Sequence, residues 1–326
     1  MAGTPSYLSL YRSGELLRRV EALEARLLDC DLCPHKCLVD RRIKTGVCRS
    51  GIVPVVASVC AHHGEEPPLS GTRGSGTVFF GNCNMKCAYC QNYQISQDKN
   101  CLHGKEMGNN TLAQQLISLQ NESNCHNINF VSPSHFVPQM VRAVFTAIPL
   151  GLQLPIVYNT GGYDSVDVLK LLEGIVDIYL PDIRYADDVI AKKYSGVNEY
   201  VEHNRAAIAE MHRQVGLLQE NTEGIAQKGM IVRHLILPNR LAGSRESLTW
   251  LAKHVSPNVF VSIMSQYYPT HHAGHFPELA RRINQSEYDE VVQLLEKLGM
   301  ENGWIQDMES TDNYQPDFHR EGHPFG

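Results

Sequence analysis

The 326-residue sequence lacks long apolar runs, a secretory signal and, beyond Cys125, any cysteine. No apolar stretch approaches the ~20 residues that a membrane-spanning helix needs. The N-terminus, Met1 to Leu10, is polar and turn-rich, without a basic segment followed by an apolar one. We therefore expect a cytoplasmic protein with no membrane partner, in a compartment where free thiols stay reduced.

A concentration of basic charge is also lacking. The 29 Lys and Arg residues are spread along the chain against 35 Asp and Glu residues, for a net charge of −6. Because nucleic-acid binding requires clustered Lys and Arg, this distribution argues against a nucleic-acid partner. The apolar fraction of 43% suffices for a sizeable core, and the length suits one large domain with a small appendage or two ordinary domains.

The sequence does contain ten cysteines, and seven of them fall into two compact groups. The groups are Cys30, Cys33, Cys37 and Cys48, and Cys83, Cys87 and Cys90. Compact groups in a long cytosolic chain are typical of metal sites rather than of a disulfide framework. Cys60, Cys101 and Cys125 are expected to be ordinary small buried residues.

From Thr77 onward, short apolar runs alternate with helical patterns. The predicted strands are Thr77–Phe80, Ile128–Val131, Pro155–Tyr158, Val176–Leu180, Met230–Leu237 and Val259–Met264. The predicted helices are Leu112–Gln120, Pro138–Ala147, Val166–Leu172, Ala186–Lys193, His203–Leu217, Arg245–His254 and Ser286–Leu298. Such alternation predicts an α/β fold with a parallel sheet and right-handed crossovers. Six strands are too few for a closed eight-stranded barrel, so we expect a partial (β/α)6 barrel with ligands at the carboxyl ends of its strands.

Ahead of this region lies a segment of different character. Glu15–Leu28 has the apolar spacing of a helix, whereas Cys30–Ser75 is rich in Gly and Pro and poor in regular pattern. We expect an N-terminal Cys-rich, metal-stapled extension over residues 1–75, the partial barrel over 76–310, and an extended tail over 311–326.

Cys83, Cys87 and Cys90 follow directly on the first predicted barrel strand. Their spacing lets three thiolates of one loop bind a single iron–sulfur cube and leaves one iron of a 4Fe–4S cluster open to an amino-acid chelate. A zinc knuckle or a ferredoxin-type cluster without its fourth ligand are the alternatives. Neither accounts for the aromatic Tyr89 just before the last cysteine or for the preceding strand.

This CxxxCxΦC motif at the end of a first strand resembles the signature of the radical S-adenosylmethionine (SAM) superfamily. More narrowly, the chain resembles the uncharacterised iron–sulfur proteins that are similar to pyruvate formate-lyase activating enzyme. The stretches that carry the resemblance are CDLCPHKC, GEEPPLSG, GNCNMKCAYCQNYQIS, RHLILPN and MSQYYP. It implies a radical-SAM partial barrel with a 4Fe–4S cluster on Cys83, Cys87 and Cys90, which binds SAM.

The resemblance also implies roles for residues at later strand ends. Tyr89 would pack near the adenine, and Ser132 and Ser134 stand where relatives bind the methionine amine. Asn159 and Gly161 would face the sulfonium and ribose, and Asp182 and Arg184 stand where relatives have an Asp-x-Lys. His234 would contact the ribose or carboxylate, and Gln266 would line the substrate side. Taken alone, the Asn159–Gly161 stretch is a turn, Asp182 could cap the helix predicted at Ala186–Lys193, and His234 could be a core residue.

The reaction implied is reductive cleavage of SAM to a 5′-deoxyadenosyl radical, which abstracts a hydrogen atom. Likeness to activating enzymes suggests a glycyl residue of a partner protein as the target, with an external electron donor such as flavodoxin or ferredoxin. Another peptide or a small molecule is the alternative target. A non-catalytic iron–sulfur or zinc module, for electron transfer or as a scaffold, is the alternative from a different class.

Three further groups carry ligand-type side chains. Cys30, Cys33, Cys37 and Cys48 can hold zinc or an auxiliary iron–sulfur cluster, with His35 as a substitute ligand, and we favour a structural staple over an electron relay. His62–Leu69 offers two histidines and the acidic pair Glu65 and Glu66, either as a metal or acid–base site or as a solvated turn. His271, His272 and His275 lie where substrate could enter, or they are surface residues without a role in the site.

Overall fold

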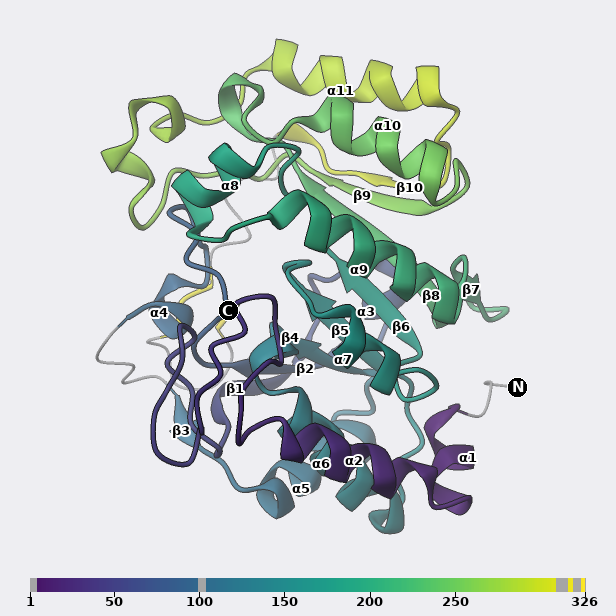
Figure 1. The fold of residues 1–326 in the computed structure, drawn as a ribbon. Coiled ribbons are helices and arrows are strands. Elements are labelled where there is room, and N and C mark those ends of the chain that lie inside the picture. The colour runs from purple at the N-terminus through teal and green to yellow at the C-terminus, as the bar shows by residue number, and fades with distance from the viewer. Residues whose placement is uncertain (1–4, 99–103, 309–315, 319–323, 326) are drawn as a thin grey trace.

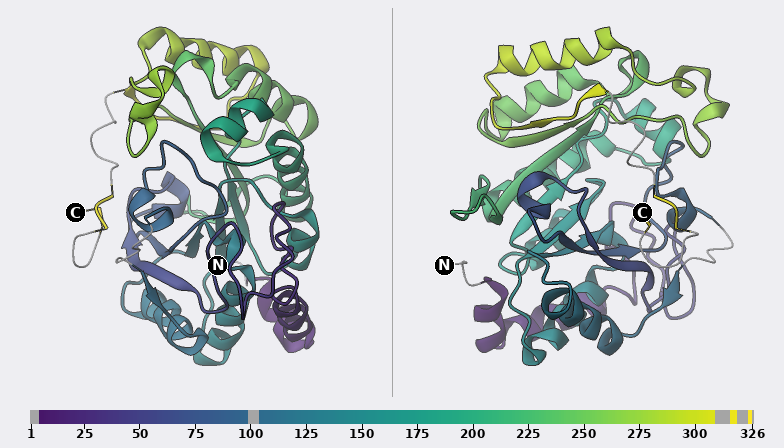
Figure 2. Two further views of the ribbon diagram at one scale, coloured as in Figure 1. Left: turned by 60° about the vertical axis from the view of Figure 1, so that its left-hand side comes forward. Right: turned by 180° about the vertical axis from the view of Figure 1, so that it is seen from behind.

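The computed structural model describes residues 5–98, 104–308, 316–318 and 324–325, so that the prediction for Cys101 falls outside the described residues. One curved sheet runs through the molecule, with most of the longer helices packed along its outer side (Figures 1 and 2). In this part of the chain, no helix is both long and apolar enough to cross a membrane.

The sheet has seven parallel strands in the order β10-β9-β8-β6-β5-β4-β2, and β1 and β3 extend it antiparallel at the β2 side. The strands are β1 (Val55–His62), β2 (Ser75–Phe80), β3 (Lys105–Glu106), β4 (Ile128–Val131), β5 (Ile156–Thr160), β6 (Ile178–Pro181), β7 (Gln219–Glu220), β8 (Ala226–Leu235), β9 (Phe260–Met264) and β10 (Gly303–Ile305). All six predicted strands are therefore present, and the predicted α/β partial barrel is confirmed.

The helices join these strands in sequence. They are α1 (Tyr7–Arg12), α2 (Glu15–Ala25), α3 (Pro67–Ser70), α4 (Tyr93–Ser96), α5 (Asn109–Asn121), α6 (Val137–Ala147), α7 (Val166–Leu171), α8 (Asp188–Ser195), α9 (Tyr200–Val215), α10 (Ser244–His254) and α11 (Gln285–Leu298). Each predicted helix is present with its ends shifted by a few residues, which is the usual uncertainty of helix boundaries.

The prediction that Cys30–Ser75 lacks regular structure was wrong over β1. This strand pairs antiparallel with β2, so a segment assigned to the N-terminal extension joins the barrel sheet. Most side chains of β1 are only half-buried, without alternation between buried and exposed positions. In its sequence, VVASVCAH, Ser58 interrupts the apolar residues, so that neither a continuous apolar run nor strict alternation results. β10 was missed because three residues are too few for any period to show.

A small apolar cluster closes the inside of the barrel toward the amino-terminal ends of its strands. Leu69 of α3 is fully buried there against Val157, Ile178 and Ile231 from three of the parallel strands. Since α3 follows directly on Gly64–Glu66, this plug fixes the acidic pair beside it, and Glu65 enters the cavity above. The segment between β1 and β2 thus forms the floor of the space between the strand ends.

The N-terminal end of α8 is capped by Asp187, and not by Asp182 as one interpretation of the sequence had it. The Asp187 carboxylate accepts hydrogen bonds from the N–H groups of Val189 (2.7 Å) and Ile190 (3.1 Å). We expect Asp187→Ala to lower the free energy of unfolding by about 1 kcal/mol in a denaturant titration. Ser165→Ala is the control, because Ser165 caps α7 without a side-chain hydrogen bond; an equal loss in both variants would contradict this account.

Candidate active site

A cavity of about 230 Å³ lies at the carboxyl ends of the parallel strands. Its lining includes ten of the residues that the sequence singled out: Cys83, Cys87, Tyr89, Cys90, Ser132, Ser134, Asn159, Gly161, Asp182 and Arg184. Parallel strands place their carboxyl ends at one edge of a sheet, and therefore residues up to a hundred positions apart meet here. Gln266, expected on the substrate side, lines the cavity as well.

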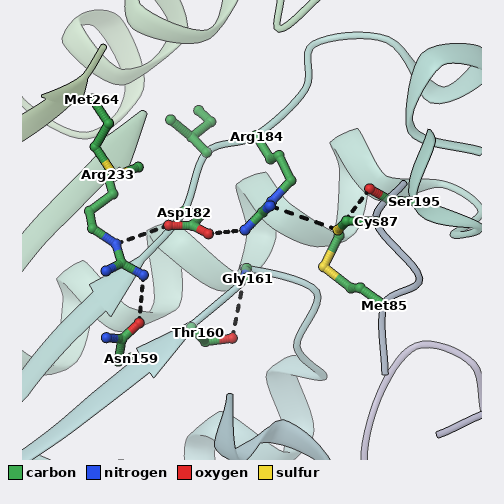
Figure 3. Close-up of polar contacts among 12 residues, drawn as sticks. Met85, Cys87, Asn159, Thr160, Gly161, Asp182, Arg184, Ser195, Arg233 and Met264 are labelled. Atoms are coloured by element: carbon green, nitrogen blue, oxygen red, sulfur yellow. Dashed lines mark hydrogen bonds and ion pairs between the residues drawn. The ribbon is translucent and has the colours of Figure 1, made fainter. Parts of the chain in front are cut away.

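The loop after β2 carries three cysteines, and polar hydrogens point at their sulfur atoms. Cys87 Sγ accepts from the Ser195 hydroxyl at 3.0 Å and lies 3.7 Å from Arg184 Nη1 (Figure 3). Cys83 Sγ accepts from the Met85 N–H at 3.4 Å, and Cys90 Sγ lies 3.3 Å from Ser96 Oγ. These donors stabilise negative sulfur, as thiolate ligands of a metal require.

The donor set of this loop fits an iron–sulfur cluster. It offers three soft thiolates from one loop, which suits three irons of a 4Fe–4S cluster and leaves the fourth to another ligand. Burial raises the pKa of the Cys90 thiol to about 12. A metal that displaces the thiol proton is the usual way to hold such a group as a thiolate.

Tyr89 forms an aromatic wall of the cavity. Its ring is buried and packs edge-on against Tyr267 at 5.6 Å between centroids. Its hydroxyl donates to the Tyr185 hydroxyl at 2.5 Å, and Tyr185 lies 2.7 Å from Ser195, the residue that bonds Cys87. Burial raises the pKa of Tyr89 far above its ordinary value, so the phenol stays neutral.

A row of alternating charges runs from the cysteine loop across the cavity wall (Figure 3). Arg184, next to Cys87, forms an ion pair with Asp182, and Asp182 accepts in turn from Arg233 Nε at 3.0 Å. Arg233 Nη2 also donates to Asn159 Oδ1 at 2.6 Å. The guanidinium of Arg184 thus reaches the carboxylate and the sulfur together, a planar fork that a lysine in its place could not provide.

Gly161 leaves room for the cysteine loop. A Cβ atom there would stand 2.8 Å from Met85 Sδ, so a larger residue would push against the loop between Cys83 and Cys87. The next residue, Gly162, has φ +76°, and a Cβ there would lie 2.3 Å from the Asp182 carbonyl oxygen. The two glycines therefore let the β5 end, the β6 end and the cysteine loop approach one another closely.

His234 does not line the cavity, which corrects its prediction as a cofactor contact. It is fully buried, with Nδ1 2.7 Å from the Ile183 carbonyl oxygen and Nε2 2.8 Å from Ser244 Oγ. Burial lowers its pKa, in keeping with a neutral core histidine. Because neighbours on a strand point to opposite faces, Arg233 takes the place facing the cavity. The sequence signal for it was an arginine directly after the apolar run Met230–Val232.

The two serines after β4 differ in their surroundings. Ser132 has the left-handed φ of +54°, which turns the chain sharply at the strand end. Ser134 is buried, with its hydroxyl 3.2 Å from Thr160 Oγ1. Thr160 donates in turn to Asp164 at 2.6 Å. Ser134 is therefore tied into a hydrogen-bonded wall, while Ser132 shapes the backbone beside the cavity.

Glu65 is the member of the acidic pair that enters the cavity. Its side chain is only 8% exposed and lies 3.8 Å from Arg233 Nη1 through Oε2. Its Oε1 accepts from the amides of Asn129 (3.1 Å) and Asn159 (3.4 Å). Burial, followed by repulsion from Glu66, raises the pKa of Glu65 to about 7.

This raised pKa has a consequence for stability. Between the ordinary carboxyl pKa and about 7, the unfolded chain has lost the Glu65 proton while the folded protein keeps it, so stability falls as pH rises. We expect Glu65→Gln to gain on the order of 2 kcal/mol relative to wild type on going from pH 5 to pH 8, as measured by denaturant unfolding. A difference between the two proteins that stays constant with pH would contradict the assignment.

The N-terminal cysteine group forms a compact, strained segment. Cys30, Cys33 and Cys48 are buried and Cys37 is half-buried. Non-glycine residues with left-handed φ stand beside these cysteines: Lys36 (+40°), Leu38 (+50°) and Arg49 (+58°). Such backbone persists only where the surroundings hold it in place. Over the described residues, neither cysteine group surrounds a single point as the ligands of one metal ion would.

His35 links the two cysteine groups. Its Nε2 lies 2.7 Å from the carbonyl oxygen of Asn84, inside the loop of Cys83 and Cys87, so this nitrogen bridges the two groups and is not a substitute ligand for a cysteine. The His271–His275 segment touches the same loop from another side: the His272 N–H donates to the Ala88 carbonyl at 2.8 Å.

Known proteins resemble this chain only distantly in sequence and structure. No family model matches the chain. It is 29% identical over 293 residues to the uncharacterized protein MJ0674 of Methanocaldococcus jannaschii, covering 87% of this chain and 79% of that protein. Solved structures include a radical SAM methyltransferase from Sphaerobacter thermophilus (14% identity, 71% of this chain and 66% of that chain, TM-score 0.46). Another is HydG, a maturase of the [FeFe]-hydrogenase (10% identity, 70% and 50%, TM-score 0.49). At these scores, no residue role is carried over from them.

Proposed function

We propose that this chain is a radical SAM enzyme. The observation that carries the proposal is the position of Cys83, Cys87 and Cys90 on one loop at the carboxyl end of β2, opening into a cavity with charged walls. The motif and its place in a parallel partial barrel agree with the resemblance found in the sequence. A module that only transfers electrons would have no use for a cavity walled by Arg184, Asp182 and Arg233.

A bound 4Fe–4S cluster and SAM would supply one-electron cleavage of the sulfonium and a 5′-deoxyadenosyl radical. The three cysteines would hold the cluster, and Ser195 and Arg184 would donate hydrogen bonds to its Cys87 sulfur. Tyr89 offers an aromatic face for a purine. Arg184 and Asp182 offer a donor fork and an acceptor for the carboxylate and ribose hydroxyls of SAM.

The test of this proposal is spectroscopic. Anaerobically reconstituted and reduced protein is expected to show the electron paramagnetic resonance signal of a 4Fe–4S cluster, and addition of SAM is expected to change that signal. A signal that SAM leaves unaltered, at SAM concentrations that saturate related enzymes, would contradict direct binding of SAM to the open iron.

Two targets for the hydrogen abstraction follow from the sequence, and the cavity favours one. The resemblance supports a glycyl residue of a partner protein. The structure supports a small molecule, because α3 closes the floor and Pro316 and Phe325 of the tail line the cavity. Phe325 packs on His62 at 4.1 Å and on Phe79 at 5.9 Å between ring centroids. A protein loop would have to displace these contacts to enter.

We also propose an external one-electron donor, such as a flavodoxin or ferredoxin, and a metal staple at the N-terminal cysteines. Burial of Cys30, Cys33 and Cys48 together with the strained backbone beside them supports the staple. Metal analysis of a Cys83/Cys87/Cys90 triple alanine variant separates the sites. Zinc or iron retained in that variant supports the staple, and a metal-free variant contradicts it.

A further inference from the structure

We propose that Glu65, at the floor of the cavity with Glu66 and Asn129 directly beside it, binds the protonated primary amine of a small-molecule substrate. The inference rests on the proposed function in one respect: the amine belongs to the molecule whose hydrogen atom is abstracted. It assigns that molecule a chemical class, which neither the motif nor the comparisons supply.

The first observation is that Glu65 has a carboxylate oxygen without a hydrogen-bond donor. Both amide contacts, from Asn129 and Asn159, end on Oε1. Oε2 faces Arg233 Nη1 at 3.8 Å, beyond hydrogen-bond length. The Nε and Nη2 groups of Arg233 are directed at Asp182 and Asn159 instead. Glu65 therefore lies in the cavity wall as a buried acid whose ion pair with Arg233 is long, at 3.8 Å, and whose Oε2 accepts no hydrogen bond from the described residues.

The second observation is that two more acceptor oxygens around Glu65 have no donor. Within the described residues, Glu66 Oε2 and Asn129 Oδ1 are buried without a hydrogen-bond partner. Glu66 is 9% exposed and Asn129 is fully buried. Leaving a buried acceptor unsatisfied costs free energy comparable to a lost hydrogen bond. A ligand that brings several donors to this place would recover that loss.

The balance of charge selects a cation as the ligand. The carboxylates of Glu65, Glu66 and Asp182 surround Arg233, and the only other cation in the row is Arg184. Both guanidinium groups already bond Asp182, so the floor has an excess of acceptors and, once Glu65 is ionised, of negative charge. A primary ammonium is a compact charge with three N–H donors, which suits the Glu65 carboxylate and the unsatisfied acceptors beside it. A carboxylate or phosphate would meet repulsion here.

The position of the floor suits a substrate rather than SAM. Asn129 lies inside β4, two residues before its carboxyl end, and α3 closes the barrel just below. The cysteine loop is separated from Glu65 by Arg184, Asp182 and Arg233 in turn. A molecule held by its amine at Glu65 would extend its carbon chain up the cavity, toward the place where the radical forms.

The test is calorimetric titration of the full-length reconstituted protein with SAM bound, at pH 8, where Glu65 is ionised. The probes are n-butylammonium, n-butanol and butyrate, which share a chain and differ in charge. We expect saturable binding of n-butylammonium, weakened at least about tenfold for the other two probes and for Glu65→Gln. Glu301→Gln, at an exposed position far along the chain, is the matched control and should bind as wild type does.

Butyrate binding as tightly as n-butylammonium, or undiminished n-butylammonium binding in Glu65→Gln, would overturn the proposal. Should Glu65→Gln fail to fold, Glu65→Asp keeps the charge but withdraws it by one methylene, and it should weaken n-butylammonium while leaving the order of the three probes unchanged. Binding is measured apart from SAM cleavage, so the two ideas fail separately. Ammonium binding in a wild-type protein that cleaves no SAM would refute the proposed function alone.

Discussion

Replacing Cys83, Cys87 or Cys90 singly with alanine is expected to lower 5′-deoxyadenosine formation from SAM by at least about a hundredfold. Each thiolate would hold one iron of the cluster. A loop with two cysteines leaves a further iron without its protein ligand, so we expect the 4Fe–4S cluster to be lost. Iron bound after anaerobic reconstitution should fall by about four per chain in each variant, and the product should be followed by chromatography under dithionite.

Cys60→Ala is the matched control for these variants. Cys60 is a half-buried cysteine of β1, packed beside Phe79 but absent from the cavity lining. Its replacement should leave both iron content and product formation within a factor of about two, as for a small buried residue outside any site. Equal losses in Cys60→Ala and Cys83→Ala would show that the cysteine substitutions act through folding and not through a cluster.

Asp182→Ala is expected to cost roughly 3 kcal/mol of unfolding free energy, because it leaves two guanidinium groups without their carboxylate. Arg184 and Arg233 both bond Asp182, and neither arginine can shed its charge. Their side chains are 19% and 18% exposed, so partial hydration keeps the loss near the lower end of the range for a broken buried pair. Denaturant unfolding of the reduced apo-protein measures it.

The control for that variant is Asp167→Ala. Asp167 is 73% exposed and its ion pair with Lys170 spans 3.8 Å, so the loss should remain within about 0.5 kcal/mol. A loss at Asp182 no greater than that at Asp167 would mean that the row of charges does not hold the cavity wall together. Unfolding is compared at one pH, since Glu65 makes stability depend on pH.

The barrel could be predicted from the sequence because its parallel strands are short and buried on both faces. β4, β5 and β6 consist of buried residues throughout, and these appear in the sequence as compact apolar runs. β1 escaped prediction since Ser58 interrupts its apolar residues and most of its side chains are only half-buried. Helix patterns on the outer side were equally readable, because one face of each helix packs on the sheet.

The residues of the site likewise fall into those that the sequence could predict and those that it could not. The cysteine loop and the polar residues at strand ends could be predicted, since a motif and strand ends are local features of sequence. Glu65 and Arg233 could not be assigned, because their meeting depends on α3 plugging the barrel and on which face of β8 points inward. A shift of one position along that strand separates Arg233 in the cavity from His234 in the core.

The most direct measurement of the central claim is product analysis with the wild-type protein. Anaerobically reconstituted enzyme, reduced with dithionite and supplied with SAM, should form 5′-deoxyadenosine and methionine in equal amounts, and neither in the absence of reductant. A protein that holds a full 4Fe–4S complement on Cys83, Cys87 and Cys90 and yet forms no 5′-deoxyadenosine above the reductant-free control would contradict the assignment.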